Sequence, residues 1–230
     1  MIPLQDDTPS TLRPYVTYAL IALCVVIYAW QSALDARGVQ RVVDALGAIP
    51  AVLLTDAHLP PELSWVPRYA TPFTSMFLHA SWMHLLGNLL FLWIYGDNVE
   101  DALGHVRYAL FYAACGIGAV FLQALGDPRS AYPIIGASGA ISGVLGAYLL
   151  LFPRARVLTL VLLPFFPTTV RVPAMLLLLL LLLWFAVQLL SDAALTGDAS
   201  VAFRAHIGGF VAGMLLVPLL KRRNVRLFAA

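Results

Sequence analysis

Charged residues are scarce in this sequence. Asp, Glu, Lys and Arg together make up 11% of its 230 residues, whereas 61% of the residues are hydrophobic. A water-soluble domain of this length could not keep so much apolar surface away from water, so the composition excludes that class and predicts a polytopic membrane protein. The formal net charge of +2 is also too small to indicate a nucleic-acid partner.

The chain also has too few cysteines for a disulfide framework, and it lacks the histidine and cysteine spacings that are typical of a zinc site. Cys24 and Cys115 both lie inside apolar runs, so we interpret them as small buried side chains. The sequence HASWMH separates His79 from His84 by five positions, which does not place both on one helix face, and His-Glu-x-x-His does not occur. We therefore expect neither a metal nor another cofactor.

Long apolar runs are abundant, and they predict an all-α membrane domain. A membrane-spanning helix needs roughly 20 mostly apolar residues, whereas a barrel would show short alternating strands. Six candidate spans are expected, at residues 15–34, 82–95, 108–125, 138–152, 172–190 and 205–220. Residues 39–54 have helical apolar spacing with many polar residues, which is typical of a helix at the interface. Residues 157–166 are too few to cross, so we expect an interfacial or re-entrant piece there.

The polar flanks of the apolar region predict the domain organisation. We expect a short cytoplasmic segment at residues 1–13, a six-helix membrane domain at 14–220 and a basic cytoplasmic tail at 221–230. The opening MIPLQDDTPS lacks the basic start of a cleaved signal peptide, so the first span is expected to stay as an anchor. Basic residues in PRAR and KRRNVR favour cytoplasmic termini, and the six-span form suits a prokaryotic cytoplasmic membrane.

Four polar side chains fall near the starts of alternate spans. If the spans alternate in direction, the second, fourth and sixth all enter from the outer side of the membrane. The second carries His84 and Asn88, the fourth carries Ser138, and the sixth carries His206. Polar and ionisable groups in membrane helices cost free energy and usually face a protein interior or a wet cavity. These four residues are therefore the candidate site.

The residue types in this set are suited to acyl transfer. The hydroxyl of Ser138 becomes a nucleophile when a base removes its proton, and a neutral histidine such as His206 can do so near pH 7. His84 and Asn88 are four positions apart, about 6 Å along a helix axis, and could form a pair of donors for a developing oxyanion. Ser138 also opens its predicted helix, where backbone N–H groups are free. No acidic third member is evident, so we expect a Ser-His dyad.

Glycines surround the serine and recur on the sixth span. The glycines that we assign to the motif and to helix packing are Gly136, Gly139, Gly143, Gly209 and Gly213. Small residues four positions apart let membrane helices approach closely, which would bring Ser138 within reach of His206. Ser142, one turn further along, is interpreted as a packing residue, because a serine in a glycine-rich span usually packs or bonds to the backbone.

Three ordered motifs resemble those of the rhomboid intramembrane serine proteases. GASG at residues 136–139 resembles the G-x-S-G of that family, and HLLGN at 84–88 resembles its H-x-x-x-N. AHIGG at 205–209 resembles its A-H-x-x-G, and the likeness extends over residues 45–220. One departure is Thr71-Pro72, which stands where many members have Trp-Arg in the first loop.

The resemblance implies an activity and roles for the site residues. Ser138 would be the nucleophile and His206 the base, with His84, Asn88 and the Ser138 backbone N–H forming the oxyanion hole. It also implies a six-helix core with a cavity open to the outer side. The partners would be the lipid bilayer and single-pass or polytopic membrane-protein substrates, cleaved near the outer membrane boundary, without nucleic acid or metal.

Two other function classes remain open at this point. A catalytically silent rhomboid-like protein that binds membrane clients would have the same fold, although the presence of both Ser138 and His206 argues against it. A channel or transporter would predict charged residues within the spans, which the sequence lacks.

Overall fold

Helices dominate the structure, a computed structural model that describes residues 2–162, 166–195 and 203–228. The helices are α1 (Tyr15–Ser32), α2 (Ala36–Leu46), α3 (Pro50–Leu54), α4 (Thr71–Thr74), α5 (Trp82–Leu103), α6 (His105–Gly126), α7 (Ser138–Leu151), α8 (Ala174–Leu195) and α9 (Phe203–Leu220). The strands are β1 (Ile2–Asp6), β2 (Arg156–Leu162) and β3 (Pro167–Pro173), and short 3₁₀ turns occupy Pro61–Leu63, Arg68–Ala70 and Ser75–Phe77. The predicted helical membrane class is confirmed.

Each of the six expected spans coincides with a helix, but the helices differ in their ability to cross a membrane. Within the described residues, α1, α6, α8 and α9 are long and apolar enough to do so. Helix α5 qualifies together with the helical segment before it, from which it is bent by 83°, and it continues to Leu103, well past the expected end at residue 95. Helix α7 has 14 residues. The structure therefore gives four or five candidate spans, against the six that the sequence predicts.

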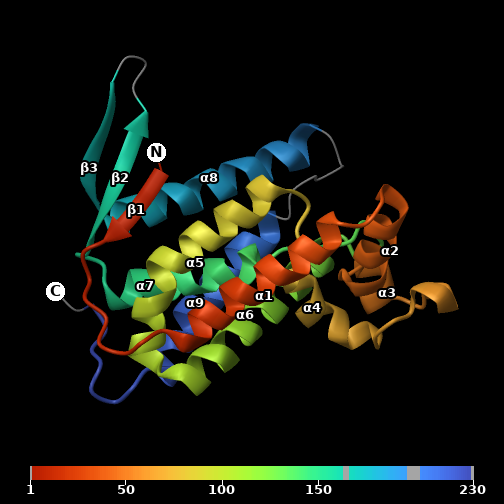
Figure 1. The fold of residues 1–230 in the computed structure, drawn as a ribbon, viewed down its shortest axis with the longest axis horizontal. Helices are drawn as coiled ribbons and strands as arrows, with labels where there is room; N and C mark the ends of the chain where they lie inside the picture. Colours follow the sequence, from red (N-terminus) through yellow and green to blue (C-terminus); the bar gives the residue numbers. More distant parts are fainter. Residues whose placement is uncertain (1, 163–165, 196–202, 229–230) are drawn as a thin grey trace.

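Helix α7 forms the centre of the bundle. Every residue from Gly139 to Leu149 is buried. The helix is no more polar than its neighbours, so its composition fits this buried position. Helices α5, α6, α8 and α9 lie around it (Figure 1). A short helix can stay in this position because protein, rather than lipid, surrounds it on all sides. The helix therefore begins inside the molecule, at Ser138.

Helices α7 and α9 touch through their backbones. A Cβ atom added to Gly209 would collide with the carbonyl group of Gly139, and one added to Gly213 would collide with that of Gly143. One turn further along α7, a Cβ on Gly146 would collide with the carbonyl group of Phe210. Only glycine permits this approach, which fixes the register of the two helices.

A three-stranded antiparallel sheet lies at the end of the bundle that holds both chain termini (Figure 1). The central strand β2 pairs with β1 and β3. Residues 157–162 of the expected interfacial or re-entrant piece thus belong to a strand, residues 163–165 lie outside the described residues, and an interfacial location stays a prediction. This segment finds backbone partners at the distant Ile2–Asp6, which local hydrophobicity does not reveal.

Polar side chains attach the N-terminal segment to the bundle. Tyr148 of α7 donates a hydrogen bond to the Asp6 carboxylate at 2.5 Å, and the amide of Asn98 on α5 donates to the Thr8 carbonyl at 2.9 Å. The boundaries expected at residues 13 and 220, and the cytoplasmic location of the flanks, stay predictions.

The segment between α1 and α5 packs at the opposite end of the bundle (Figure 1). Helix α2 begins at an N-cap, Asp35, whose carboxylate accepts from the Gly38 N–H at 2.8 Å. Thr71 and Pro72, which stand where many family members have Trp-Arg, are both buried at the start of α4. The neighbouring Arg68 guanidinium donates to the carbonyls of Val52 and Thr55 at 3.5 and 3.4 Å, so this loop is attached to α3 and its C-terminal end.

The contact between α7 and α9 predicts a difference between two glycine substitutions. Gly209→Ala forces the helices apart and should lower the free energy of unfolding by about 1–3 kcal/mol. Gly118→Ala on α6 is the control, because no described atom lies within 4 Å of its added Cβ, and alanine is the better helix former. Thermal unfolding in detergent micelles measures both. Equal transition temperatures would contradict the backbone contact.

Candidate active site

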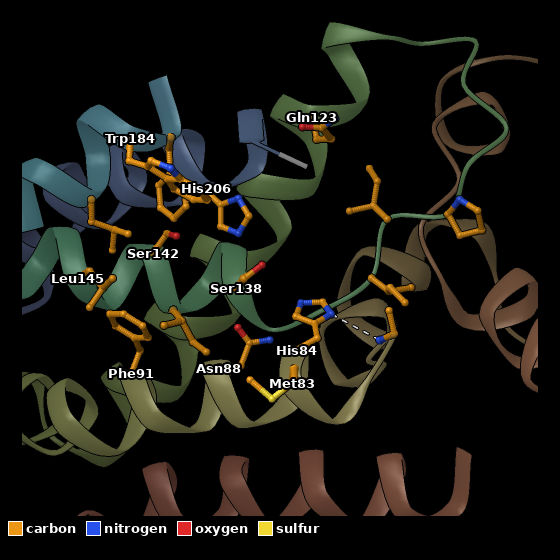
Figure 2. Close-up of a pocket in the computed structure, with 18 of the residues that line it drawn as sticks. Met83, His84, Asn88, Phe91, Gln123, Ser138, Ser142, Leu145, Trp184 and His206 are labelled. Atoms are coloured by element: carbon orange, nitrogen blue, oxygen red, sulfur yellow. Dashed lines mark hydrogen bonds between the residues drawn. The ribbon is translucent and has the colours of Figure 1, made fainter. Parts of the chain in front are cut away.

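A cavity of about 900 Å³ opens among the starts of α5, α7 and α9 (Figure 2). All four candidate site residues line it: His84 and Asn88 from α5, Ser138 from α7 and His206 from α9. Figure 2 shows Ser138 between the ring of His206 on one side and His84 with Asn88 on the other. The other polar side chains of the lining are Gln123, Ser130, Tyr132 and Ser142. Residues far apart in the sequence are thus brought to one cavity.

Ser138 is the first residue of α7, and the loop before it is anchored at several points. Gly136 donates its N–H to the Ser75 carbonyl at 2.9 Å, and Ile134 pairs with Ala48 in an isolated bridge. Among the described residues, no side chain caps the N–H groups at the start of α7. These groups carry the positive end of the helix dipole and are available to a developing negative charge beside Ser138.

Gly136 lets this loop pass directly over the His84 ring. Its φ is +114°, a backbone conformation that residues with a side chain rarely adopt. A Cβ added there would lie 2.7 Å from Cε1 and 2.8 Å from Nε2 of His84. The Nε2 edge of the imidazole therefore faces the backbone that leads into Ser138.

The backbone and the ring of His84 both take part in hydrogen bonds at the start of α5. The Ser81 hydroxyl accepts from the His84 backbone N–H at 3.1 Å and caps the helix. In the ring, Nδ1 accepts from the Ala80 N–H at 3.4 Å, the dashed contact of Figure 2. A neutral imidazole that accepts at Nδ1 carries its proton at Nε2, so this nitrogen is a donor toward the cavity.

Asn88 supplies a second donor beside His84. Its side chain is 7% exposed, and its Nδ2 atom has no hydrogen-bond partner among the described residues. A buried N–H group without a partner costs roughly 1–3 kcal/mol, a cost that an oxygen of a bound molecule would remove. Asn88 Nδ2 also lies 3.8 Å from the Cβ position above Gly136, so both donors border the same loop.

Neighbouring helices hold His206 in place. The backbone N–H of Ala205, the preceding residue, donates to the Gln123 side-chain oxygen of α6 at 3.2 Å. The ring of Phe185 on α8 stacks on the imidazole, with ring centroids 4.5 Å apart and an angle of 17° between the planes. His206 is thus bordered by α6, α7 and α8.

The other histidines that the structure describes lie outside the cavity. His79 is fully buried, and its backbone carbonyl accepts from the Gln31 amide at 2.8 Å, a contact that connects α1 with the loop before α5. His105 bonds to the Glu100 carboxylate at 2.6 Å at the start of α6, and His58 lies in the first loop. No group of three His, Cys, Asp or Glu side chains suited to a metal occurs in the described parts of the chain.

The cavity also contains residues that the sequence analysis did not select. Gln123 could have been found, because it is an isolated polar residue near the end of an apolar span. Ser142 was interpreted as a packing residue, yet it lines the cavity one turn beyond Ser138. Trp184 and Phe185 gave no signal, since aromatic residues are ordinary in an apolar helix.

Comparisons with known proteins agree with the motifs. The family model of the rhomboid domain matches residues 67–223. Rhomboid protease GluP of Bacillus subtilis is 35% identical over 137 residues, which cover 60% of this chain and 24% of that protein. Rhomboid protein 1, mitochondrial, of Saccharomyces cerevisiae is 30% identical over 153 residues, 64% of this chain and 39% of its own length.

A plant relative shows how local some of the similarity is. Rhomboid-like protein 11, chloroplastic, of Arabidopsis thaliana is 44% identical over 71 residues, 31% of this chain and 25% of that protein. The chain thus aligns with about a quarter to two fifths of the length of these three relatives.

The close approach of Gly136 to His84 can be tested with a second glycine of positive φ. Gly104 has a φ of +82°, but no described atom lies within 4 Å of its added Cβ. Gly104→Ala therefore introduces backbone strain without a collision. Both substitutions should cost about 1–2 kcal/mol of strain, and Gly136→Ala should cost about 1–3 kcal/mol more from the collision. Thermal unfolding measures the difference.

A double-mutant cycle identifies the colliding group. In a His84→Ala background, the additional cost of Gly136→Ala should fall toward that of Gly104→Ala, because the ring is gone. An additional cost that persists would exclude the His84 ring as its cause.

Proposed function

Because this chain belongs to the rhomboid family, we propose that it is an intramembrane serine endopeptidase that hydrolyses peptide bonds of membrane-protein substrates. The observation that carries the proposal is the single cavity lined by Ser138, His206, His84 and Asn88. A hydroxyl, an imidazole and two side-chain donors are the groups that acyl transfer requires.

The proposed reaction has two halves. Ser138 Oγ attacks the scissile carbonyl carbon while His206 accepts the hydroxyl proton, and a tetrahedral intermediate forms. His206 then gives this proton to the leaving amine as the C–N bond breaks, which leaves an acyl-serine. In the second half, a water molecule attacks the acyl carbon, His206 accepts the proton of that water, and the proton returns to Ser138 Oγ as the acid product leaves.

The oxyanion of each tetrahedral intermediate would be held by three donors. His84 Nε2–H and Asn88 Nδ2 border the loop that leads into Ser138, and the backbone N–H of Ser138 lies at the start of α7. The unpaired, buried state of Asn88 Nδ2 supports this role, because the donor already lacks competing partners among the described residues. Asn88 also lines the cavity next to Ser138, and a donor in this position would stabilise the negative charge of the transition state.

The base is proposed to act in a dyad. The described residues that line the cavity include no carboxylate. The cavity volume is large enough for several water molecules, which occupy about 30 Å³ each in the liquid. Hydrolysis within a membrane domain needs such a space to bring water to Ser138.

We propose that the site opens toward the outer side of a prokaryotic cytoplasmic membrane. The chain is a multi-pass membrane protein. Both of its ends lie at the end of the bundle that carries the sheet (Figure 1). The segment between α1 and α5, which contacts the loop before Ser138, lies at the opposite end. The basic residues of PRAR and KRRNVR occur at the sheet end, which favours cytoplasmic termini. Cleavage would then take place near the outer boundary of a substrate helix.

A silent client-binding protein is the second candidate. Rhomboid-like proteins appear among the relatives next to named proteases, so family membership alone does not separate the two functions. The presence of both the hydroxyl and the imidazole in one cavity favours the protease.

The nucleophile can be tested without knowledge of the substrate. Purified protein in detergent should be labelled at Ser138 by a fluorophosphonate probe, and Ser138→Ala or His206→Ala should abolish labelling while the thermal transition is retained. Ser142→Ala is the matched control, since this hydroxyl lines the same cavity and should be dispensable for labelling. Labelling that survives in Ser138→Ala would refute the assignment, and an unlabelled wild-type protein would favour the silent alternative.

Loss of one oxyanion donor should slow the reaction without removing the nucleophile. Asn88→Ala is expected to lower the cleavage rate by about 10²- to 10³-fold, because one such donor contributes about 3 kcal/mol. The rate is measured on a reporter membrane segment that wild-type protein cleaves in proteoliposomes. An Asn88→Ala rate within twofold of wild type would exclude Asn88 from the oxyanion hole.

A further inference from the structure

We propose that Phe185 on α8 is a positioning residue for His206, a proposal that rests on the protease function argued above. Its ring holds the imidazole in the orientation that faces Ser138 and stabilises the imidazolium that forms when His206 takes the proton. Phe185 would act through His206 and would not touch the reacting atoms.

The stacking geometry carries this inference. The Phe185 and His206 ring centroids lie 4.5 Å apart and the planes differ by 17°, an arrangement in which one face of the imidazole is covered. Phe203, three residues before His206 on α9, has its centroid 6.4 Å from the imidazole and 6.5 Å from Phe185. Trp184 meets Phe203 edge-on at 5.9 Å. The ring beside His206 is therefore itself packed among aromatic side chains.

A covered face restricts the imidazole in a way that the backbone cannot. The torsion between Cβ and the ring of a histidine is broad, so a fixed α9 backbone does not by itself set the angle of the ring. Stacking against Phe185 opposes this rotation, because turning the ring would lose the contact. The nitrogen that must meet Ser138 Oγ is thereby kept in one plane.

The same contact favours the charged form of the base during the reaction. A cation over the face of an aromatic ring is attracted by the ring quadrupole. His206 is neutral before the attack and positively charged in the tetrahedral intermediate. The contact with Phe185 is therefore stronger in the transition state than in the resting protein, which is the condition for an effect on kcat.

The ring comes from the candidate span with the smallest buried share. Only 11% of the residues in the α8 span Ala174–Ser191 are buried, compared with 33% for α9. Its first residue is held next to the sheet, since the Ala174 N–H donates at 2.8 Å to the carbonyl of Ala155, the residue before β2. A displacement of the lightly packed part of α8 would carry Phe185 away from His206, so the position of this helix would determine whether the base is correctly oriented.

A spectroscopic measurement tests the contact independently of activity. In the wild-type protein, the ring current of Phe185 should shift the His206 imidazole proton resonances upfield, with the assignment made by their loss in His206→Ala. Phe185→Leu should remove that shift, and Phe185→Tyr should keep it. Leu183→Ala, a change at an exposed position of the same helix, is the control and should leave the resonances in place. Unchanged resonances in Phe185→Leu would overturn the proposal.

Kinetics test the consequence of the contact. Phe185→Leu should slow fluorophosphonate labelling of Ser138 and lower kcat on a cleaved reporter segment by about 2- to 30-fold, the range expected for one cation–π contact. KM should stay within twofold, and Phe185→Tyr should restore the rate. A Phe185→Leu protein that is as fast as wild type, or faster, would show that Phe185 is merely part of the cavity wall. A wild-type protein whose Ser138 is never labelled would instead overturn the proposed function itself, and with it any catalytic role for this ring.

Discussion

The backbone contact between α7 and α9 is the constraint on which the site depends. Gly139 follows Ser138 directly, and Gly209 lies three residues after His206, so the point where the helices touch is adjacent to both functional side chains. A Cβ at Gly209 would collide with the Gly139 carbonyl group of α7, whereas a Cβ at Gly139 would collide with Ala119 of α6, so a side chain at either position would disturb the packing around the site. The hydroxyl and the imidazole are therefore held by main-chain packing, which is stiffer than any arrangement of long side chains.

A second constraint joins the loop before Ser138 to α5. Gly136 passes over His84 at a distance that excludes a side chain, and the same loop is bonded to Ser75 and paired with Ala48. The segment between α1 and α5 thus supports the residues on both sides of the cavity. In the same segment Thr71 and Pro72 are buried, and the Arg68 guanidinium donates to the carbonyls of Val52 and Thr55.

The parts of the structure that were predictable from the sequence are those with a local signal. Long apolar runs mark the helices, and polar residues at the starts of alternate runs mark His84, Asn88, Ser138 and His206 before any coordinates are known. Strand β2 was missed because an apolar stretch of seven residues has no distinctive period, and its partner β1 lies about 150 positions earlier in the sequence. Asn88 shows that a property without a local signal is also missed at the site. The sequence predicts the helix face on which Asn88 lies, whereas the absence of a hydrogen-bond partner for its Nδ2 atom among the described residues depends on every neighbouring helix.

Helix α8 is the part of the site about which the sequence says least. Its leucine run is apolar on all sides, so no periodicity distinguishes the face toward the cavity from the face toward lipid. The structure gives Phe185 a defined partner on this otherwise uniform helix. The three helices that carry the proposed chemistry are packed together, whereas α8 packs mainly against α9 and has the smallest buried share of the candidate spans. Under the proposed function, a substrate segment would enter a cavity that this lightly buried helix borders. Because α8 also carries the ring that stacks on His206, the proposed entry of a substrate and the proposed orientation of the base would both depend on this one helix.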